Sequence, residues 1–319
     1  MIIAELLAKF HAYNVRHKSD KTVRFYRSRL RLFAAKFGKR PVGKLTPLEI
    51  DEFLELAGRN ADGQPLSSTT CRHNAVALTT LQSFALEHEL IAKPWFRKLK
   101  KPRARRRERI PEPEEIAALL KHANPAFRLI YTALAQSGAR PGELCAATIA
   151  DVIRDERPRI ELAKHKTAAK TGKPRIIPLG GHFLATVIAA IGDRQAGPIF
   201  LSEQGKGWNV NNLSSMHRKL RDAAGLPRDL VLYLARHRFA TECLRAGVSL
   251  NDVSLLMGHA DIKTTQIYLH RDATEAAAGQ DKVPDLPKLP ETGADTGKPG
   301  QYKIDGIIWR EKPRDKDAA

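Results

Sequence analysis

The feature that most constrains the fold is the basic block RKLKKPRARRRER, from Arg97 to Arg109. It holds nine basic residues, one acid and one proline. A block of this kind repels itself and has little apolar surface to bury, so it predicts an extended linker rather than part of a core. The chain of 319 residues also exceeds the usual size of one domain. We therefore predict two domains, joined by a linker over residues 96–112.

Residues 1–95 have the pattern of a small all-helical domain. An amphipathic helix begins near Thr22, because apolar residues recur there every three or four positions. A second helix is expected to begin at Thr46 and end at Gly58, and a third to follow Ser67. The first of these carries apolar side chains on one face and arginines on another: Val23, Tyr26, Leu30, Phe33 and Phe37 against Arg24, Arg27 and Arg31.

Residues 113–275 predict a second domain, mainly α with a small β-hairpin or sheet, which makes the fold class α+β. A helix over 127–136 is stopped by Gly138, and Pro141 begins another, which leaves Arg140 between two helices. Short strands and a hairpin follow Asp151. Helices then return at 182–191, 213–224, 232–246, 250–256 and 262–270. Residues 276–319 lack periodicity, so we expect a mobile C-terminal tail.

The charge balance points to a polyanionic partner. Lys and Arg number 54 against 35 Asp and Glu, which gives a formal charge of +19 and a pI near 10.0. Nucleic acid is the first candidate and an anionic membrane surface the second. No run of about 18 apolar residues occurs. The first residues are too broken a run for a secretion signal, and the three scattered cysteines resemble buried free thiols. We therefore expect a cytoplasmic protein.

A tyrosine near the end of the second domain needs an explanation. Tyr268 stands nine residues after His259 in MGHADIKTTQIYLH, on the short helix expected over 262–270. A core tyrosine would belong to an apolar stripe, but a polar run from Lys263 to Gln266 precedes this one. We therefore expect an exposed tyrosine whose hydroxyl is the functional group.

Other polar residues are ambiguous when taken singly. Arg140 could cap a helix, and Arg236 could belong to a basic helix face. His259 could satisfy a helix end, and the hairpin lysines Lys166 and Lys170 could be ordinary turn residues.

Together these residue types suit the cleavage of a phosphodiester, which is an anion that repels nucleophiles. Two arginines on rigid helices can grip the phosphate oxygens with forked donors. A hairpin lysine could protonate the leaving oxygen, and a histidine adds a hydrogen bond. A tyrosine hydroxyl can attack to form a phosphotyrosine. This set of groups requires neither metal nor nucleotide.

The order of these motifs resembles that of the tyrosine recombinases of the phage-integrase and Xer type. In that family an arginine with Gly-Glu-Leu precedes a hairpin lysine, a His-x-x-Arg box, a Gly-His pair and a tyrosine. This chain has, in the same order, Arg140 before Gly142-Glu-Leu144, KHKTAAKTGKPRIIPL, Tyr233-Leu-Ala-Arg236-His237, Leu256-Met-Gly-His259 and Tyr268. The resemblance covers residues 113–275. Residues 1–95 resemble, more loosely, the family's core-binding domain.

The resemblance implies the role of each matching residue. Arg140 and Arg236 would clamp the scissile phosphate, and Tyr268 would attack it and free a 5′ hydroxyl. His259 would hydrogen-bond a nonbridging oxygen or the nucleophile, while Glu143 would brace the site. The implied partners are double-stranded DNA, three further copies in a homotetramer on paired sites, and accessory DNA-bending or directionality proteins, with no cofactor.

Two positions depart from the family pattern or leave it ambiguous. Tyr233 stands where the box normally has histidine, and it is a poor base because its ordinary pKa is about 10. We interpret it as a positioning group. The hairpin offers both Lys166 and Lys170 as the catalytic lysine, and the strand position favours Lys166 narrowly.

Two other functions are compatible with the same fold. One is a DNA-binding protein that has lost catalysis, and the other is a type IB topoisomerase. The separate helical domain and the short hairpin favour a recombinase. A zinc enzyme is disfavoured because the sequence has no HExxH or comparable ligand pair. A nucleotide-driven motor is disfavoured because GADTGKPG lacks the spacing of a phosphate loop.

The basic block generates a prediction about salt. If it lies along DNA as a strap, its phosphate contacts release counterions, so affinity for a duplex falls steeply between low and moderate salt. Titration of labelled duplex at several salt concentrations measures the slope. A nearly flat slope would mean that the block is only a solvated hinge.

Overall fold

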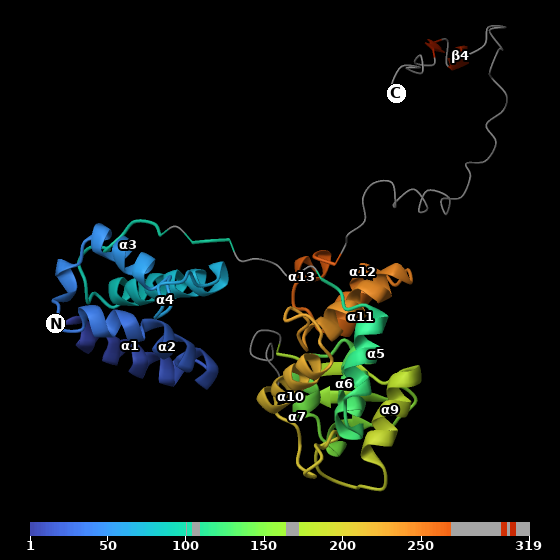
Figure 1. Ribbon diagram of the computed structural model, residues 1–319. Helices are drawn as coiled ribbons and strands as arrows, with labels where there is room; N and C mark the ends of the chain where they lie inside the picture. Colours follow the sequence, from blue (N-terminus) through green and yellow to red (C-terminus); the bar gives the residue numbers. More distant parts are fainter. Residues whose placement is uncertain (100, 104–108, 164–171, 269–300, 305–306, 311–319) are drawn as a thin grey trace. The chain divides into compact units, whose positions relative to one another are not determined.

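The computed structural model describes residues 1–99, 101–103, 109–163, 172–268, 301–304 and 307–310 (Figure 1). The chain divides into two compact units, Met1–Glu108 and Arg109–Ala319, and the division falls inside the basic block. Helices dominate, with one small antiparallel sheet in the second unit, so the predicted fold class is confirmed.

Four helices build the N-terminal unit, and the capping residues anticipated in the sequence begin two of them. Thr46 Oγ1 accepts the amide hydrogen bond of Glu49, and Ser67 Oγ accepts that of Thr70. The helix expected from Thr22 begins two residues earlier, after Ser19. The helices are α1 (Ile3–His17), α2 (Asp20–Phe37), α3 (Pro47–Leu56) and α4 (Ser68–Glu87), with the 3-10 turn η1 (Val42–Lys44).

The core of this unit extends further than the sequence indicated. Phe96 and Leu99, placed in the linker by the sequence, are buried with the side chains of the helices. Gln82 holds Phe96 from both sides: its Nε2 donates to the Phe96 carbonyl at 3.0 Å, and its Oε1 accepts the Phe96 amide at 3.1 Å. Trp95 Nε1 likewise donates to the Val42 carbonyl at 2.7 Å. The packed unit therefore reaches Leu99.

The second unit contains the sheet and the remaining helices. Its strands are β1 (Val152–Ile153), β2 (Arg159–Leu162) and β3 (Arg175–Pro178), in the order β1-β2-β3 with both pairs antiparallel. Ile160 pairs with Val152 on one side and Ile177 on the other. The helices are α5 (Pro113–Lys121), α6 (Pro125–Ser137), α7 (Pro141–Ala146), α9 (Gly181–Ile191), α10 (Val210–Ala223), α11 (Leu234–Arg245), α12 (Leu250–Met257) and α13 (Lys263–Gln266), with the 3-10 turn η2 (Ile149–Asp151).

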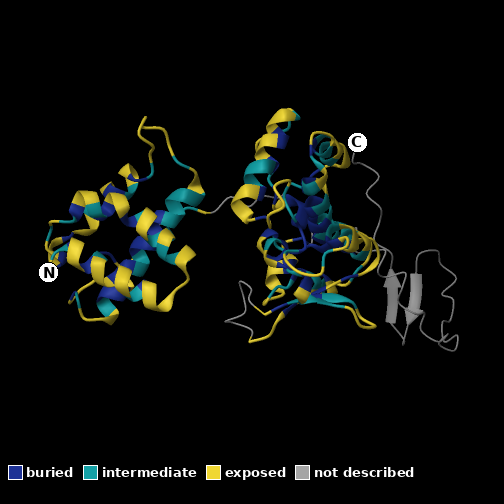
Figure 2. Ribbon diagram, turned by 90° about the horizontal axis from the view of Figure 1, so that it is seen from below, coloured by how far each residue is buried: buried dark blue, intermediate teal, exposed yellow. Residues whose placement is uncertain are grey.

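Helix α6 is the centre of this unit. It packs against α9 and α11, and Phe127, Ile130 and Leu134 on it are almost wholly buried. Figure 2 shows the buried residues inside the bundle and the exposed ones on the outer helix faces. Gly138 ends the helix in the left-handed conformation, at φ +60°, as the sequence predicted. No helix within the described ranges has the length and apolarity to cross a membrane.

One expectation about the rest of the chain needs correction. The cysteines are free but only partly buried, so the expected burial of Cys71, Cys145 and Cys243 is wrong. The mobility expected for the tail, residues 276–319, stays a prediction; within the tail, strands β4 (Gln301–Ile304) and β5 (Ile307–Arg310) pair in antiparallel fashion. Each of these strands contains isoleucine and one aromatic residue, types that favour strands. The other residues after 268 lie outside the described part.

His217, a buried histidine of α10 that packs beside α6, predicts that acid lowers the stability of the fold. Burial, and then the charge of Arg221, lowers the pKa of His217 to about 4. The unfolded chain takes up this proton near its ordinary pKa, about 6.5. The free energy of unfolding should therefore fall as the pH drops from about 6.5 to about 4, by up to about 1.4 kcal/mol per pH unit. Denaturant unfolding at several pH values measures the slope.

The variant His217→Phe should lower this slope, because phenylalanine carries no titratable group and its ring can pack beside Phe127 and Tyr131 as the imidazole does. His122→Phe on the exposed surface is the matched control. An unchanged slope in His217→Phe would contradict the assignment.

Candidate active site

The site is built on the C-terminal end of α12. A helix leaves its last carbonyl groups without partners inside the helix, and these groups carry partial negative charge. Here arginines from three other segments of the chain occupy them. Arg175 donates to the carbonyls of Leu255 and Leu256, Arg236 to that of Met257 at 2.7 Å, and Arg140 to that of Gly258 at 3.0 Å.

Arg140 lies between α6 and α7, as the sequence predicted. Its backbone amide donates to Glu143 Oε2 at 2.9 Å, and its Nη1 donates to Glu143 Oε1 at 2.6 Å. Arg175 Nε also lies 3.4 Å from Glu143 Oε2. Burial alone would raise the pKa of Glu143, but Arg175 and Arg140 outweigh it and hold that pKa below its ordinary value. Glu143 therefore braces two arginines, the position expected for it.

Arg236 is the most deeply placed cation of the site, with 1% of its side chain exposed. Its Nη1 donates to the Gly138 carbonyl at 2.5 Å, and its Nη2 lies 2.9 Å from His259 Nε2. The Nε atom has no hydrogen-bond partner within the described part of the chain. Burial lowers the pKa of Arg236 to about 10, so the guanidinium stays charged at neutral pH.

His259 lies among these cations and is uncharged. Burial, and then Arg236, Arg140 and Arg175, lowers its pKa to about 4. Its Nδ1 lies 2.7 Å from Thr265 Oγ1. Both ring nitrogens are therefore engaged, so the imidazole is fixed in the site.

Tyr268 is buried, with 6% exposed, so the expectation of an exposed tyrosine is wrong. Helix α13 ends at Gln266, which shortens the helix expected over 262–270 and turns the following residues so that Tyr268 faces inward. It packs against Val253 and Met257, and its ring is parallel to that of His259 within 4° at a centroid distance of 6.5 Å. Burial raises its pKa to about 12, which keeps the hydroxyl protonated.

Of the remaining predicted residues, the structure describes Tyr233, which lies at the edge of this cluster. Tyr233 precedes α11 and is 41% exposed, with its ring 5.4 Å from that of His237. A negative charge on the Tyr233 hydroxyl would raise the pKa of both Arg236 and Tyr268, so Tyr233 borders the site. Lys166 and Lys170 lie outside the described residues. Figure 1 shows that α11, α12 and α13, which carry Arg236, the helix-end carbonyls and Thr265, lie together.

Sequence reasoning missed two residues of the site. Arg175 is 4% exposed and carries a full charge, yet a signal for it existed: β3 alternates buried and exposed positions, which places Arg175 on the same face as Ile177. Thr265 is fully buried within a run of polar residues, where no local pattern distinguishes it from its neighbours.

The cluster carries excess positive charge. The cations Arg140, Arg175 and Arg236 surround one carboxylate, that of Glu143, while the imidazole and phenol are neutral. Arginine forks suit planar or tetrahedral oxyanions, so the arrangement suits an anion such as a phosphate.

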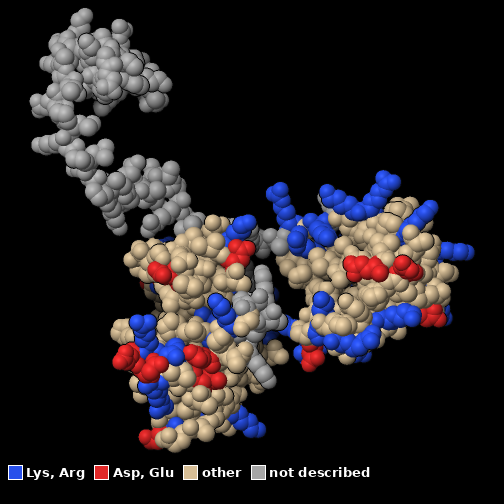
Figure 3. Space-filling model, turned by 180° about the vertical axis from the view of Figure 1, so that it is seen from behind, with Lys and Arg blue, Asp and Glu red and all other residues tan. Residues whose placement is uncertain are grey.

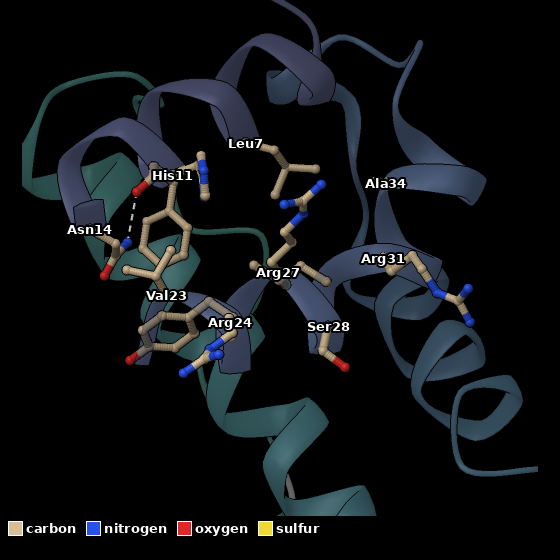
Figure 4. Close-up of a pocket in the computed structure, with 12 residues that line it drawn as sticks. Leu7, His11, Asn14, Val23, Arg24, Arg27, Ser28, Arg31 and Ala34 are labelled. Carbon is tan, nitrogen blue, oxygen red and sulfur yellow. Dashed lines mark hydrogen bonds between the residues drawn. The ribbon is translucent and has the colours of Figure 1, made fainter. Parts of the chain in front are cut away.

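A second basic feature lies in the N-terminal unit. A groove of about 880 Å³ runs between α1 and α2, with Leu7, Phe10 and Leu30 among its apolar lining. Arg24, Arg27 and Arg31 of α2 line it together (Figure 4), alongside Val23 and Tyr26 of the apolar stripe. Lys and Arg side chains are also spread over the visible face of this unit, where Asp and Glu form smaller patches (Figure 3).

Comparison with known proteins assigns the family. Residues 110–275 match the model described as the phage integrase family. The chain belongs to the phage integrase family. It is accordingly a tyrosine-type site-specific recombinase, as its motif order indicated.

Relatives of this protein agree with that assignment, and a solved structure of another protein shares its fold. A tyrosine recombinase of Thermosipho africanus is 27% identical over 303 residues, which cover 90% of this chain and 99% of the relative. Tyrosine recombinase XerC of Rhodospirillum centenum is 29% identical, covering 81% and 80%. A lambda integrase dimer bound to a COC′ core site is similar in fold, with a TM-score of 0.71 at 17% identity, covering 91% of this chain and 100% of that one.

The end of α12 predicts an unusually costly glycine substitution in this integrase. Gly258 has φ +63°, and an added Cβ would lie 2.6 Å from Arg175 Nε. Arg175 is fixed by its carbonyl and carboxylate partners, so it cannot easily move away. We expect Gly258→Ala to lower the free energy of unfolding by clearly more than the roughly 1–2 kcal/mol that left-handed backbone strain costs an alanine.

Gly247→Ala is the matched control, because Gly247 has φ +84° but open space around its Cβ position. Denaturant unfolding of both variants separates steric clash from strain. Equal losses would show that Arg175 is not held as the structure has it.

Proposed function

We propose that this protein is a site-specific DNA recombinase or integrase that cuts and rejoins DNA through a 3′-phosphotyrosyl intermediate, without metal or nucleotide. The observation that carries the proposal is the buried arginine cluster beside Tyr268. Three guanidinium groups with one carboxylate leave a positive site next to a nucleophilic side chain, and a phosphodiester is an anion that needs both.

The arginines hold the phosphate in this mechanism. Arg140 lies between α6 and α7, and Arg236 lies in the first turn of α11. Backbone carbonyls from other segments fix their guanidinium groups, so little reorganisation is needed when the phosphate binds. Two nonbridging oxygens would take N–H donors that the carbonyls do not use, including the Arg236 Nη2 donor that now faces the imidazole. The developing charge on these oxygens during attack is then stabilised by groups already in place.

Tyr268 then attacks phosphorus. The Tyr268 Oη–P bond forms, the bond from phosphorus to the 5′ oxygen breaks, and the leaving oxygen takes a proton from a hairpin lysine, Lys166 or Lys170. Because the phosphotyrosine keeps the energy of the broken bond, a 5′ hydroxyl from a second strand can reverse the step. Tyr233 would position groups at the edge of the site rather than transfer a proton.

The partners follow from the same mechanism. Strand exchange between two sites needs four active sites, so we propose a homotetramer on paired duplexes, with accessory DNA-bending or directionality proteins as further partners. A solved lambda integrase tetramer bound to a Holliday junction is similar in fold, with a TM-score of 0.69. Residues 1–95 would act as the core-binding domain, 96–112 as the linker and 113–275 as the catalytic domain. The basic surface of the N-terminal unit supports DNA contact there.

A DNA-binding protein without catalysis is the second candidate. Tyr233, which replaces the usual histidine, is the observation that favours it. The two functions make opposite predictions for covalent attachment.

Incubation with a nicked duplex that carries the protein's own site should trap a covalent adduct, read on a denaturing gel. Tyr268→Phe should abolish the adduct, and Arg236→Lys should slow its formation by about 10²–10³-fold, the usual cost of losing an oxyanion donor. Tyr131→Phe is the matched control, because Tyr131 is also buried in the same unit and its pKa is also raised to about 12. Tight binding of that duplex with no adduct from the natural chain would favour the second candidate.

A further inference from the structure

The hydrogen bonds of His259 fix which ring nitrogen carries its proton. Nε2 lies 2.9 Å from Arg236 Nη2, and Nδ1 lies 2.7 Å from Thr265 Oγ1. A guanidinium has only donors, so it donates to Nε2, and Nε2 must present its lone pair. The neutral ring therefore carries its proton on Nδ1 and donates it to the Thr265 hydroxyl oxygen.

Thr265 is built to hold this bond. Of the four residues of α13, it alone is buried, while Lys263, Thr264 and Gln266 are exposed. Its amide donates to the Ile262 carbonyl at 2.8 Å, so its backbone is fixed as well. The hydroxyl thus reaches the imidazole from a rigid turn three residues before Tyr268.

Two imidazoles lie beside the nucleophile: the ring centroid of Tyr268 is 5.2 Å from that of His237 and 6.5 Å from that of His259. Tyr233 stands where the family has histidine, and a phenol is a poor base at neutral pH. Glu143 is occupied by Arg140 and Arg175. His259 is the imidazole that contacts Arg236, and its two contacts direct the lone pair of Nε2 into the site, so we take it as the acceptor for the proton of Tyr268.

We propose that Thr265 is a positioning residue, which holds His259 with its proton on Nδ1 so that Nε2 accepts the hydroxyl proton of Tyr268. This rests on the proposed strand-cleavage function. A phosphate oxygen first takes the Arg236 Nη2 donor, which frees the Nε2 lone pair. The Tyr268 O–H bond then breaks as Nε2–H and Oη–P form, and the leaving 5′ oxygen takes its proton from the hairpin lysine. Rejoining returns each proton.

This assignment decides between the two roles that the family resemblance left open for His259. A histidine that held a nonbridging oxygen would need its proton on Nε2. That proton would then face the donor of Arg236 at 2.9 Å, and Nδ1 would have to accept from Thr265. The observed contacts favour the acceptor role instead.

Nitrogen-15 NMR of histidine-labelled full-length protein reads the tautomer without DNA, and His259→Gln assigns the signal. The natural chain should show His259 protonated on Nδ1. Thr265→Val, which keeps the shape but removes the acceptor, should lose this single tautomer. It should also slow adduct formation on the nicked duplex by at least about tenfold, within the 10²–10⁴-fold that a general base contributes.

Thr265→Ser should restore both the tautomer and the rate, because serine keeps the hydroxyl. If Thr265 were only structural, the rates of the variants would instead follow their thermal stability. Thr264→Val, on the exposed side of α13, is the matched control. Protonation on Nε2 in the natural chain, or a normal rate in a folded Thr265→Val, would overturn the proposal. If the natural chain forms no adduct although Nδ1 of His259 is protonated, the proposed DNA cleavage is wrong, while the assigned tautomer of His259 stands.

Discussion

The structure of the second unit depends on the carbonyl groups that the end of α12 leaves without partners inside the helix. Four consecutive carbonyls, from Leu255 to Gly258, accept hydrogen bonds from three arginines that come from distant parts of the sequence. These bonds satisfy the end of the helix and draw positive charge to one point. Gly258 makes this arrangement feasible, because its left-handed turn ends the helix where a side chain would strike Arg175. The binding site for an anion is thus a by-product of how a helix is terminated.

The same burial that assembles the cluster keeps its reactive groups uncharged. It lowers the pKa of His259 to about 4 and raises that of Tyr268 to about 12, so that in the free chain the imidazole is a neutral acceptor and the phenol a neutral donor. Part of the histidine shift comes from the nearby arginines. An anion bound between those arginines offsets their charge and raises the pKa of the histidine again. Under the proposed mechanism, the acceptor therefore becomes a stronger base only when the phosphate is present.

The two units divide the physical tasks of a DNA enzyme. The N-terminal unit has an aromatic core and a surface rich in Lys and Arg, including the groove beside α2, which suits contact with a phosphate backbone without chemistry. In the second unit the arginines of the site, Arg140, Arg175 and Arg236, face inward, where carbonyls and a carboxylate hold them. Surface cations give affinity that salt weakens, whereas buried cations act on a single phosphate and are screened much less.

Local features were predictable from the sequence by itself. Contacts within a few residues decide the helix starts at Thr46 and Ser67, the stop at Gly138 and the placement of Arg140. The motif order that indicated the family is likewise a property of the sequence itself. Only the tertiary structure decided that Phe96 and Leu99 belong to a core, that Arg175 joins the cluster, that Tyr268 is buried and which nitrogen of His259 is protonated. The physical reason is range: Arg140 meets Gly258 across 118 positions and Arg236 meets Gly138 across 98. Periodicity and capping describe neighbours along the chain, and they carry no information about partners that folding alone brings together.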